Sequence, residues 1–372
     1  MTERVPRPPT DPSLRPPESS PSLRPPCSSS SSNPLPAVPI LRPPPIPILR
    51  PPPIPIFQPP KVPLPTVVLA RELAPAAVRV GVRTGVLERV RPGAYRAPRT
   101  DPAITPAAAA RELALARIAA AARSLQTTHW FSHESAALVW GCPVWAPPTQ
   151  THIIQNVRPS QHGDPLLTRH VMTLAEADQQ EWRGVRVTSL DRTVVDCLLR
   201  LPPLDALVIA DGALRLGADR AGIAGRLIEL EGRRGVVGAR SVFDLADGRA
   251  ESAWETFVRY VLMREGLPRP ELQIVIHTRL GSFRADLGWH EWKLVLEFDG
   301  FVKYSQASGV DANEVLFKEK RRQEAIEEEG WSVLRFTAND RARPGDLFRR
   351  VRRRLPREVT ANLRPLRFLP PR

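Results

Sequence analysis

The sequence predicts a multidomain protein of mixed α+β and α/β class. Its 372 residues suffice for two or three domains, and a hydrophobic content of 42% suffices for buried cores. Proline dominates the first 65 residues, whereas helix-like and strand-like hydrophobic patterns follow from Thr66 onward. We therefore expect five segments, at residues 1–65, 66–100, 101–247, 248–357 and 358–372.

Residues 1–65 hold 24 of the 43 prolines and repeat the motif Leu-Arg-Pro-Pro. The repeat occurs at Leu14–Pro17, Leu23–Pro26, Leu41–Pro44 and Leu49–Pro52. Proline fixes φ and lacks a backbone N–H, so we predict an arm that is extended polyproline II or disordered. A solvated tail, or a start codon assigned too far upstream, is favoured over a ligand for a proline-recognition domain.

Residues 66–100 have the pattern of a small helix-and-hairpin unit. We expect helices over Val67–Leu73 and from Pro75 to about Arg83, then two strands, Val86–Val90 and Ala94–Arg96. The turn Arg91-Pro92-Gly93 would join these strands. The candidate DNA-binding residues of this unit are Arg79, Arg83, Arg89 and Arg91.

The run L-E-R-V-R-P-G-A-Y-R, Leu87 to Arg96, resembles the winged helix-turn-helix at the N-terminus of type IV (abortive-infection) antitoxins. The resemblance implies a recognition helix that carries Arg79 and Arg83, and a wing that contacts phosphate. The helix that normally precedes this unit is replaced here by the proline tract. A small interaction domain with a solvated basic face is the alternative.

Residues 101–247 begin and end with predicted helices, Thr105–Leu125 and Leu204–Leu245. Between them, Ser132–Ala137 and Thr188–Thr193 again resemble the type IV antitoxins, which implies a cognate toxin protein as a partner.

Histidine and cysteine predict no metal site. We interpret His133 and Glu134 as polar residues at a helix start rather than as a catalytic pair. The remaining histidines of this region show no ligand spacing, and the three cysteines of the chain are isolated, which suggests neither disulfides nor zinc. These residues are His129, His152, His162 and His170, and Cys27, Cys142 and Cys197.

The C-terminal part predicts the element order α-β-β-β-α-β-α. A first helix, Glu251–Glu265, has apolar residues at helical spacing and stops at Gly266 and Pro268. The later elements are strands Gln273–Thr278, Phe283–Leu287 and Lys293–Asp299, helix Asp311–Glu329, strand Ser332–Phe336 and helix Asp346–Leu355.

Acidic residues gather on the second and third of these strands. Asp286 projects from one strand, and Glu297 and Asp299 share one face of the next. Because Val295 and the Leu294/Leu296/Phe298 set indicate a strand covered on both sides, we expect the acids to be paired or to bind metal. Carboxylates with water suit Mg²⁺. The alternative is a solvated hairpin face on which the acids never meet.

The ordered motifs resemble the PD-(D/E)xK nuclease superfamily, in the branch similar to very-short-patch-repair endonucleases (domain of unknown function 559). They cover residues 250–355, under a third of the chain. The matching residues are Glu251-Ser252, Glu255, Asp286, Glu297-Phe298-Asp299-Gly300, Lys303-Tyr304, Glu319-Lys320, Arg322 and Gly330 to Phe336.

This resemblance implies a restriction-endonuclease-like (αβββαβ) domain in which Asp286, Glu297, Lys303 and Glu255 are catalytic. It also implies that Asp286, Glu297 and Asp299 hold the metal. One departure is that Asp299 stands where the superfamily has its lysine, so Lys303 or Lys320 would have to supply the positive charge.

The charge of the chain indicates a polyanionic partner. The net charge is +14, and residues 341–372 hold eleven arginines against Asp346 and Glu358. We expect Arg322, Arg350, Arg353 and Arg354 to contact DNA, with a solvated helix as the alternative. No apolar run approaches the ~20 residues that span a bilayer, and the start lacks a signal-peptide pattern. These features favour a cytoplasmic, bacterial nucleoid-associated protein.

Two functions follow as hypotheses. The leading one is Mg²⁺-dependent hydrolysis of DNA phosphodiesters by the C-terminal domain. The alternative is a non-catalytic DNA-binding regulator of the type IV antitoxin kind, with a degenerate nuclease fold, which Asp299 at the lysine position favours. The oligomeric state does not follow from the sequence.

Overall fold

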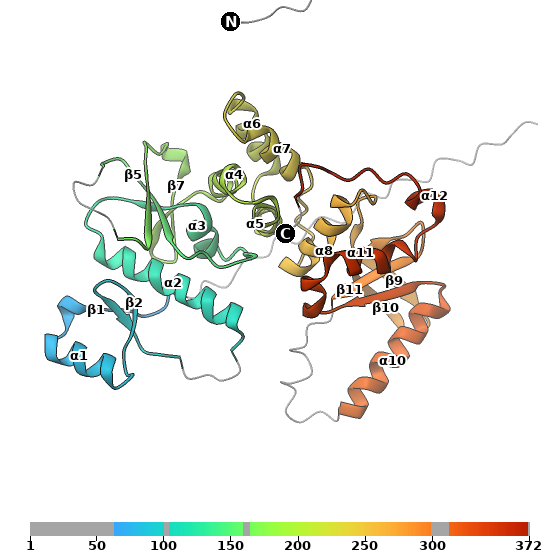
Figure 1. Ribbon diagram of the computed structural model, residues 1–372, viewed down its shortest axis with the longest axis horizontal. Helices are drawn as coiled ribbons and strands as arrows, with labels where there is room; N and C mark the ends of the chain where they lie inside the picture. Colours follow the sequence, from blue (N-terminus) through green and yellow to red (C-terminus); the bar gives the residue numbers. More distant parts are fainter. Residues whose placement is uncertain (1–62, 100–103, 159–163, 299–311, 371–372) are drawn as a thin grey trace, which may run out of the picture. The chain divides into compact units, whose positions relative to one another are not determined.

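The computed structural model describes residues 63–99, 104–158, 164–298 and 312–370 (Figure 1). Asp299 and Lys303, two of the predicted site residues, lie outside these ranges. The helices and strands form three separate sheets with helices packed against them, which confirms the mixed α and β composition.

The first sheet is small and has the strand order β1-β3-β2. Its elements, in chain order, are β1 Val68–Leu69, the 3₁₀ turn η1 Ala70–Glu72, α1 Pro75–Arg83, β2 Glu88–Arg91 and β3 Ala94–Arg96. The second helix and the hairpin are therefore where the sequence predicts them. The predicted helix over Val67–Leu73 is wrong, because Val67 and Leu69 point into the core beside Val90 and Ala94, the alternation of a strand.

The second sheet has the order β6-β5-β4-β8-β7 and is flanked by α2 and α3. Its elements are α2 Pro106–Ser124, β4 Trp130–Phe131, α3 His133–Trp140, β5 Thr151–Gln155, β6 Leu167–Val171, η2 Glu176–Asp178, β7 Gln179–Trp182 and β8 Val185–Thr188. β5 pairs with β6 in parallel and with β4 antiparallel. The Ala-rich helix is α2, whose small side chains let it pack closely on the sheet.

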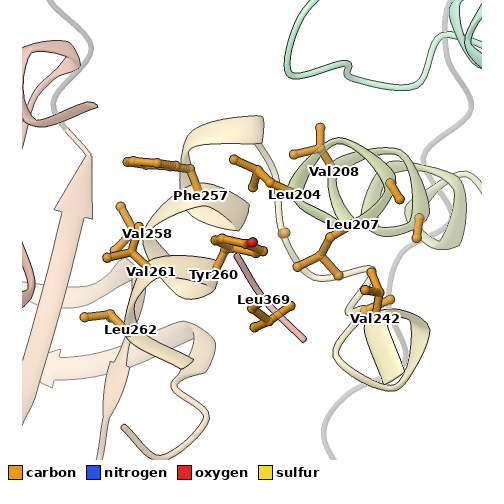
Figure 2. Packing of buried hydrophobic residues seen from close by; sticks show 14 of the residues in the cluster. Leu204, Leu207, Val208, Val242, Phe257, Val258, Tyr260, Val261, Leu262 and Leu369 are labelled. Atoms are coloured by element: carbon orange, nitrogen blue, oxygen red, sulfur yellow. The ribbon is translucent and has the colours of Figure 1, made fainter. Parts of the chain in front are cut away.

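A helical layer follows, as predicted for Leu204–Leu245. It consists of α4 Leu190–Arg200, α5 Pro203–Arg215, α6 Arg220–Glu229 and α7 Val236–Asp244. α5 packs on the next helix, α8 Ala253–Arg264, and the two share the largest hydrophobic cluster of the described residues. Figure 2 shows Leu204 and Leu207 of α5 facing Tyr260 of α8 across this cluster.

The third sheet has the order β12-β11-β10-β9. Its strands are β9 Glu271–Thr278, β10 Gly281–Trp289, β11 Leu294–Phe298 and β12 Ser332–Phe336. Its helices are α8, α10 Ala312–Glu328 and α11 Pro344–Arg352. The 3₁₀ turn η3 Ala338–Ala342 precedes α11, and the short helix α12 Arg357–Thr360 follows it. β9, β10 and β11 are antiparallel neighbours, and β12 lies parallel to β11. Within the described ranges the predicted order α-β-β-β-α-β-α is confirmed.

The buried strand β11 has apolar neighbours on both faces, as its sequence predicts. Leu294 and Leu296 belong to the large cluster with α8, whereas Val295 packs with Ile326 of α10. The last long helix differs slightly from its predicted bounds. It begins at Pro344, because proline suits the first helical turn, and ends at Arg352.

The segment beyond α12, interpreted from the sequence as a basic tail, packs back onto α8. Leu369 is 2% exposed within the large cluster, and the Tyr260 hydroxyl donates to the Pro370 carbonyl over 2.7 Å. The turn that ends α8 contacts the same segment: Gly266 has a φ of +87°, and a Cβ there would lie 2.6 Å from the backbone of Arg364. Glycine is thus required both by the backbone conformation and by the close approach.

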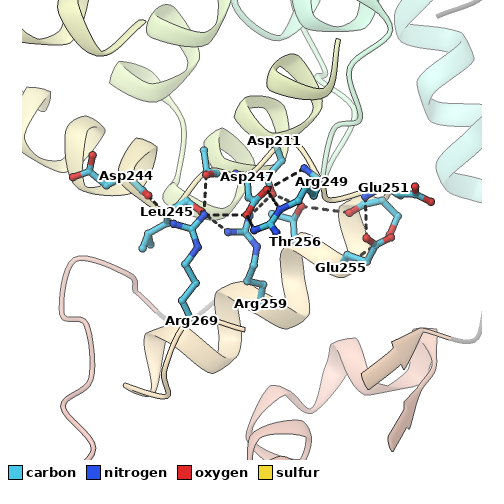
Figure 3. Close-up of polar contacts among 12 residues, drawn as sticks. Asp211, Asp244, Leu245, Asp247, Arg249, Glu251, Glu255, Thr256, Arg259 and Arg269 are labelled. Carbon is cyan, nitrogen blue, oxygen red and sulfur yellow. Dashed lines mark hydrogen bonds and ion pairs between the residues drawn. The ribbon is translucent and has the colours of Figure 1, made fainter. Parts of the chain in front are cut away.

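A buried ion pair joins α5 to α8. Arg259 is 0% and Asp211 is 1% exposed, and their side chains are bonded to each other. Asp211 also accepts from the Asp247 backbone N–H and the Thr256 hydroxyl, each over 2.7 Å (Figure 3). Arg259 additionally donates to the Leu245 carbonyl. Both carboxylate oxygens of Asp211 and both terminal nitrogens of Arg259 are thereby hydrogen-bonded, whereas the buried Nε of Arg259 has no partner among the described residues.

None of the helices in the described residues combines the length and the apolar character that crossing a bilayer requires.

Removing one partner of this pair should destabilise the protein strongly. Asp211→Ala leaves the guanidinium of Arg259 buried without the carboxylate to which it is bonded, a loss of about 3–5 kcal/mol in the free energy of unfolding. The exposed pair between Arg279 and Glu328 is a matched control, because solvent screens it and Glu328→Ala should leave the free energy of unfolding nearly unchanged. Urea unfolding of both variants measures the difference, and equal losses would contradict the role given to Asp211.

Candidate active site

The predicted acidic residues lie where the start of α8 meets β10 and β11. Glu255 is in the first turn of α8, Asp286 is on β10 and Glu297 is on β11. α8 is held at this position by aromatic packing. The rings of Trp254 and Phe298 stack with centroids 4.6 Å apart and planes 10° apart.

Glu255 is the most buried of the three acids, at 4% exposure. Its carboxylate accepts from the Glu251 backbone N–H at 2.9 Å, the Ser252 hydroxyl at 2.8 Å and the Gln273 amide at 3.0 Å. Burial raises the pKa of Glu255 to about 7, and the negative charge of Asp286 adds to the rise. The carboxyl therefore titrates near neutral pH, as a proton-transfer group or a metal ligand would.

Asp286 lies at the point where the inward-facing side chains of β9 and β10 change from one face of the sheet to the other. On β9, Leu272 packs in the cluster with α8, whereas Ile274 packs in the cluster with α10. The residue between them, Gln273, has a positive φ of 58°, which twists the strand. Asp286 sits beside this twist and its carboxylate accepts from the Phe298 backbone N–H over 2.8 Å. That bond fixes Asp286 against the end of β11.

Glu297 differs from the expectation of an open metal ligand. Both of its carboxylate oxygens accept from the guanidinium of Arg322, one of them over 3.3 Å. Arg335, its register partner on β12, approaches to 3.7 Å. Glu319 contacts the same two arginines. Glu297 is therefore neutralised by arginine in this structure, and a cation would have to replace Arg322 to reach it.

The donor chemistry of Glu255 and Asp286 suits a hard divalent cation. Two carboxylates near enough for one to raise the pKa of the other are stabilised by any cation placed between them. Within the described ranges these acids and Glu297 do not form a cluster of three close ligand atoms. Lys320 on α10 is exposed and its ammonium lies 3.8 Å from the carboxylate of Glu324.

Several predicted DNA-binding arginines are engaged within the protein. Arg91 is a correction: it is 8% exposed and pairs with Asp164 over 2.8 Å, so it is not presented to phosphate. Arg322 pairs with Glu297 and Glu319. Arg350 pairs with Asp340 over 3.0 Å, and Arg354 donates to the Ser332 hydroxyl over 2.7 Å.

The other predicted arginines are open to solvent. Arg79 and Arg83 on α1, Arg89 on β2 and Arg353 after α11 are exposed. None of these four forms an ion pair with another residue that the structure describes.

Sequence reasoning missed two features. Gln273, which binds Glu255, carries no signal beyond its place at the start of a strand. The histidines show no ligand spacing in the sequence, yet His133, His152 and His170 converge in the structure. The only sequence signal was a histidine on each of two strands that prove to be neighbours.

Comparison with known proteins gives relatives in sequence and distant neighbours in structure. No family model matches the chain. The uncharacterized proteins MT2308 and Rv2248 of Mycobacterium tuberculosis are each 34% identical over 181 residues, 48% of this chain. The match spans 65% of the length of each relative. The crystal structure of the RV2827C protein of M. tuberculosis aligns over 48% of this chain and 72% of its own, with 17% identity and a TM-score of 0.32.

The raised pKa of Glu255 predicts a loss of stability as pH rises. Below the ordinary pKa of 4.5 the group is protonated in both the folded and unfolded states, so its contribution to the free energy of unfolding is fully present. Between 4.5 and about 7 the unfolded chain loses the proton first, so stability falls by about 1.4 kcal/mol for each pKa unit.

Glu255→Gln removes this contribution and should flatten the stability profile. Urea unfolding in EDTA, at about pH 5 and about pH 8, measures it. Glu291→Gln, on an exposed turn, is the control and should follow the wild type. A Glu255→Gln profile parallel to that of the wild type would contradict the assignment.

Proposed function

We propose that the C-terminal region is a metal-dependent nuclease that hydrolyses DNA phosphodiesters. The observation that carries the proposal is Glu255, a nearly buried carboxyl titrating near neutral pH within the electrostatic reach of Asp286. Burial is the main cause of the raised pKa of Glu255, and the negative charges of Asp286 and Glu251 add to it, whereas the cationic partner of a structural ion pair would lower it.

In this proposal Asp286 and Glu255 hold Mg²⁺, which lowers the pKa of water and neutralises the charge that develops on phosphate. Asp286 is oriented by the Phe298 backbone N–H. Gln273 and Ser252 donate to Glu255 and keep its carboxylate in place. Arg322, on the α10 side of the sheet, pairs with Glu297 and neutralises the third acid of the predicted set.

The arrangement of the elements supports the proposal further. α8 precedes three antiparallel strands, and the final strand β12 lies parallel to β11. This is the order implied by the resemblance to the restriction-endonuclease-like fold, with Glu255 on the first helix, Asp286 on the second strand and Glu297 on the third. Asp299 and Lys303 belong to the same proposed site but fall outside the described residues.

The second candidate is a non-catalytic DNA-binding regulator, with a winged helix at residues 66–100. It is favoured by the bidentate pair of Glu297 with Arg322, which occupies an acid that the enzyme would need. In that case α1 and the β2–β3 hairpin carry the DNA contacts through Arg79, Arg83 and Arg89. A cognate toxin protein would be the further partner.

Cleavage of plasmid DNA separates the two candidates. The wild type should nick plasmid in Mg²⁺ and not in EDTA, and Asp286→Asn should abolish nicking because the ligand charge is lost. The exposed Glu291→Gln is the control and should cut as the wild type does. Wild-type protein that binds DNA but never cuts it, with any divalent cation, would leave the regulator as the function.

The salt dependence of DNA binding shows which arginines contact phosphate. The slope of log K against log salt falls by roughly 0.9 for each contact on duplex DNA. Replacing the exposed Arg79, Arg83 and Arg89 by Ala should therefore flatten the slope by up to about 2.7 units.

The matched triple, Arg350, Arg353 and Arg354 to Ala, should flatten the slope by no more than about 0.9 units, because two of these arginines already have partners within the protein. The opposite ranking of the two triples would assign DNA binding to the region of α11.

A further inference from the structure

Three histidines from separate elements meet in the middle region of the chain. His133 begins α3, His152 lies on β5 and His170 lies on β6. One ring nitrogen from each lies within 4.8 Å of the other two. The rings of His133 and His170 stack at 4.1 Å between centroids, and His152 lies 5.4 Å and 5.5 Å from them.

The nearest pair of nitrogens has the separation of two ligands on one metal ion. Nδ1 of His152 is 3.2 Å from Nε2 of His170. Two nitrogens at this separation, each about 2.0–2.1 Å from zinc, subtend an angle of about 100° at the ion, close to tetrahedral.

The outward nitrogens of the cluster face groups that fix ring orientation. Nδ1 of His133 is 3.0 Å from the Ser132 hydroxyl, which leaves its Nε2 to face the other rings. Nε2 of His152 is 3.6 Å from a carboxylate oxygen of Glu134. That oxygen is buried and has no hydrogen-bond partner among the described residues. A metal-bound histidine usually donates its second N–H to a carboxylate, which is the part that Glu134 is placed to take.

The cluster is largely withdrawn from solvent. His133 and His152 are 8% and 5% exposed. A neutral imidazole offers the lone pair of one ring nitrogen to a metal ion. Without an ion, His152 and His170 can share one N–H···N hydrogen bond that leaves His133 out, whereas one cation can bind all three rings.

We propose that His133, His152 and His170 bind a first-row transition metal ion, with zinc as the ion to test. Imidazole suits zinc, copper, nickel and iron and does not suit Mg²⁺, so this centre is distinct from the proposed nuclease site. Three protein ligands leave a fourth position for water. Glu134 is a positioning residue that orients His152.

Such an ion would link the strands β5 and β6 to the helix α3. β6 is the edge strand of its sheet, next to β5, and β5 packs on α3. His133 itself has a positive φ of 52°, a strained backbone for a residue with a side chain. A bond to metal at each of these three elements would hold the edge strand in register and offset the strain at His133.

Zinc titration of the full chain tests the proposal. After treatment with EDTA and its removal, the wild type should bind about one Zn²⁺ per chain and unfold at a higher temperature when loaded. His170→Ala should lose this ion, and Glu134→Gln should weaken binding about 10- to 100-fold. His277→Ala, at an exposed histidine on β9, is the control and should bind as the wild type does.

X-ray absorption on the zinc-loaded wild type gives a readout that needs no variant to fold. Three imidazole nitrogens and an oxygen are expected around the ion. Sulfur in that shell would assign the ion to a cysteine and overturn the proposal. So would unchanged zinc binding by His170→Ala, or a wild type that binds no zinc. The nuclease assay is independent, since metal binding is measured here without DNA.

Discussion

The ion pair between Asp211 and Arg259 is the constraint on which the C-terminal half of the structure depends. Both charges are withdrawn from water, so each requires the other and the few groups bonded to them. One of those groups is the backbone of Asp247, and another is Thr256 in the second turn of α8. The pair therefore fixes where α8 begins, and Glu255, the residue before Thr256, is placed by it.

The position of α8 in turn determines the electrostatics of the acidic site. Trp254 stacks on Phe298, and the backbone of Phe298 holds Asp286. Glu255 and Asp286 are thus brought together by contacts made by their immediate neighbours. The packing holds both side chains in place despite their repulsion, which contributes to the raised pKa of Glu255. Glu297 escapes this repulsion through Arg322 on the opposite side of the sheet.

Local patterns predicted much of the C-terminal fold. β12 and the Ala-rich α2 were found from periodicity and terminal residues, because their signals lie within one short stretch of sequence. The strand at Val68–Leu69 was missed because its type depends on pairing with β3. For the site, the acids on β10 and β11 were identifiable as residues. Their partners were not, because Arg322 and Gln273 meet them only through tertiary packing. The histidine cluster was missed for the same reason: the parallel pairing of β5 with β6 has no local sequence signal.

The docking of the C-terminal segment on α8 has a consequence for synthesis on the ribosome. The hydroxyl of Tyr260 and the carbonyl of Pro370 are 110 residues apart in sequence, and Leu369 completes the hydrophobic cover of the helix. At roughly 5–20 residues per second, α8 emerges roughly 5–20 s before the segment that covers it. During that interval an apolar helix surface is exposed on the nascent chain, where chaperones bind. The region containing α8 can therefore complete its fold only after translation has passed Leu369.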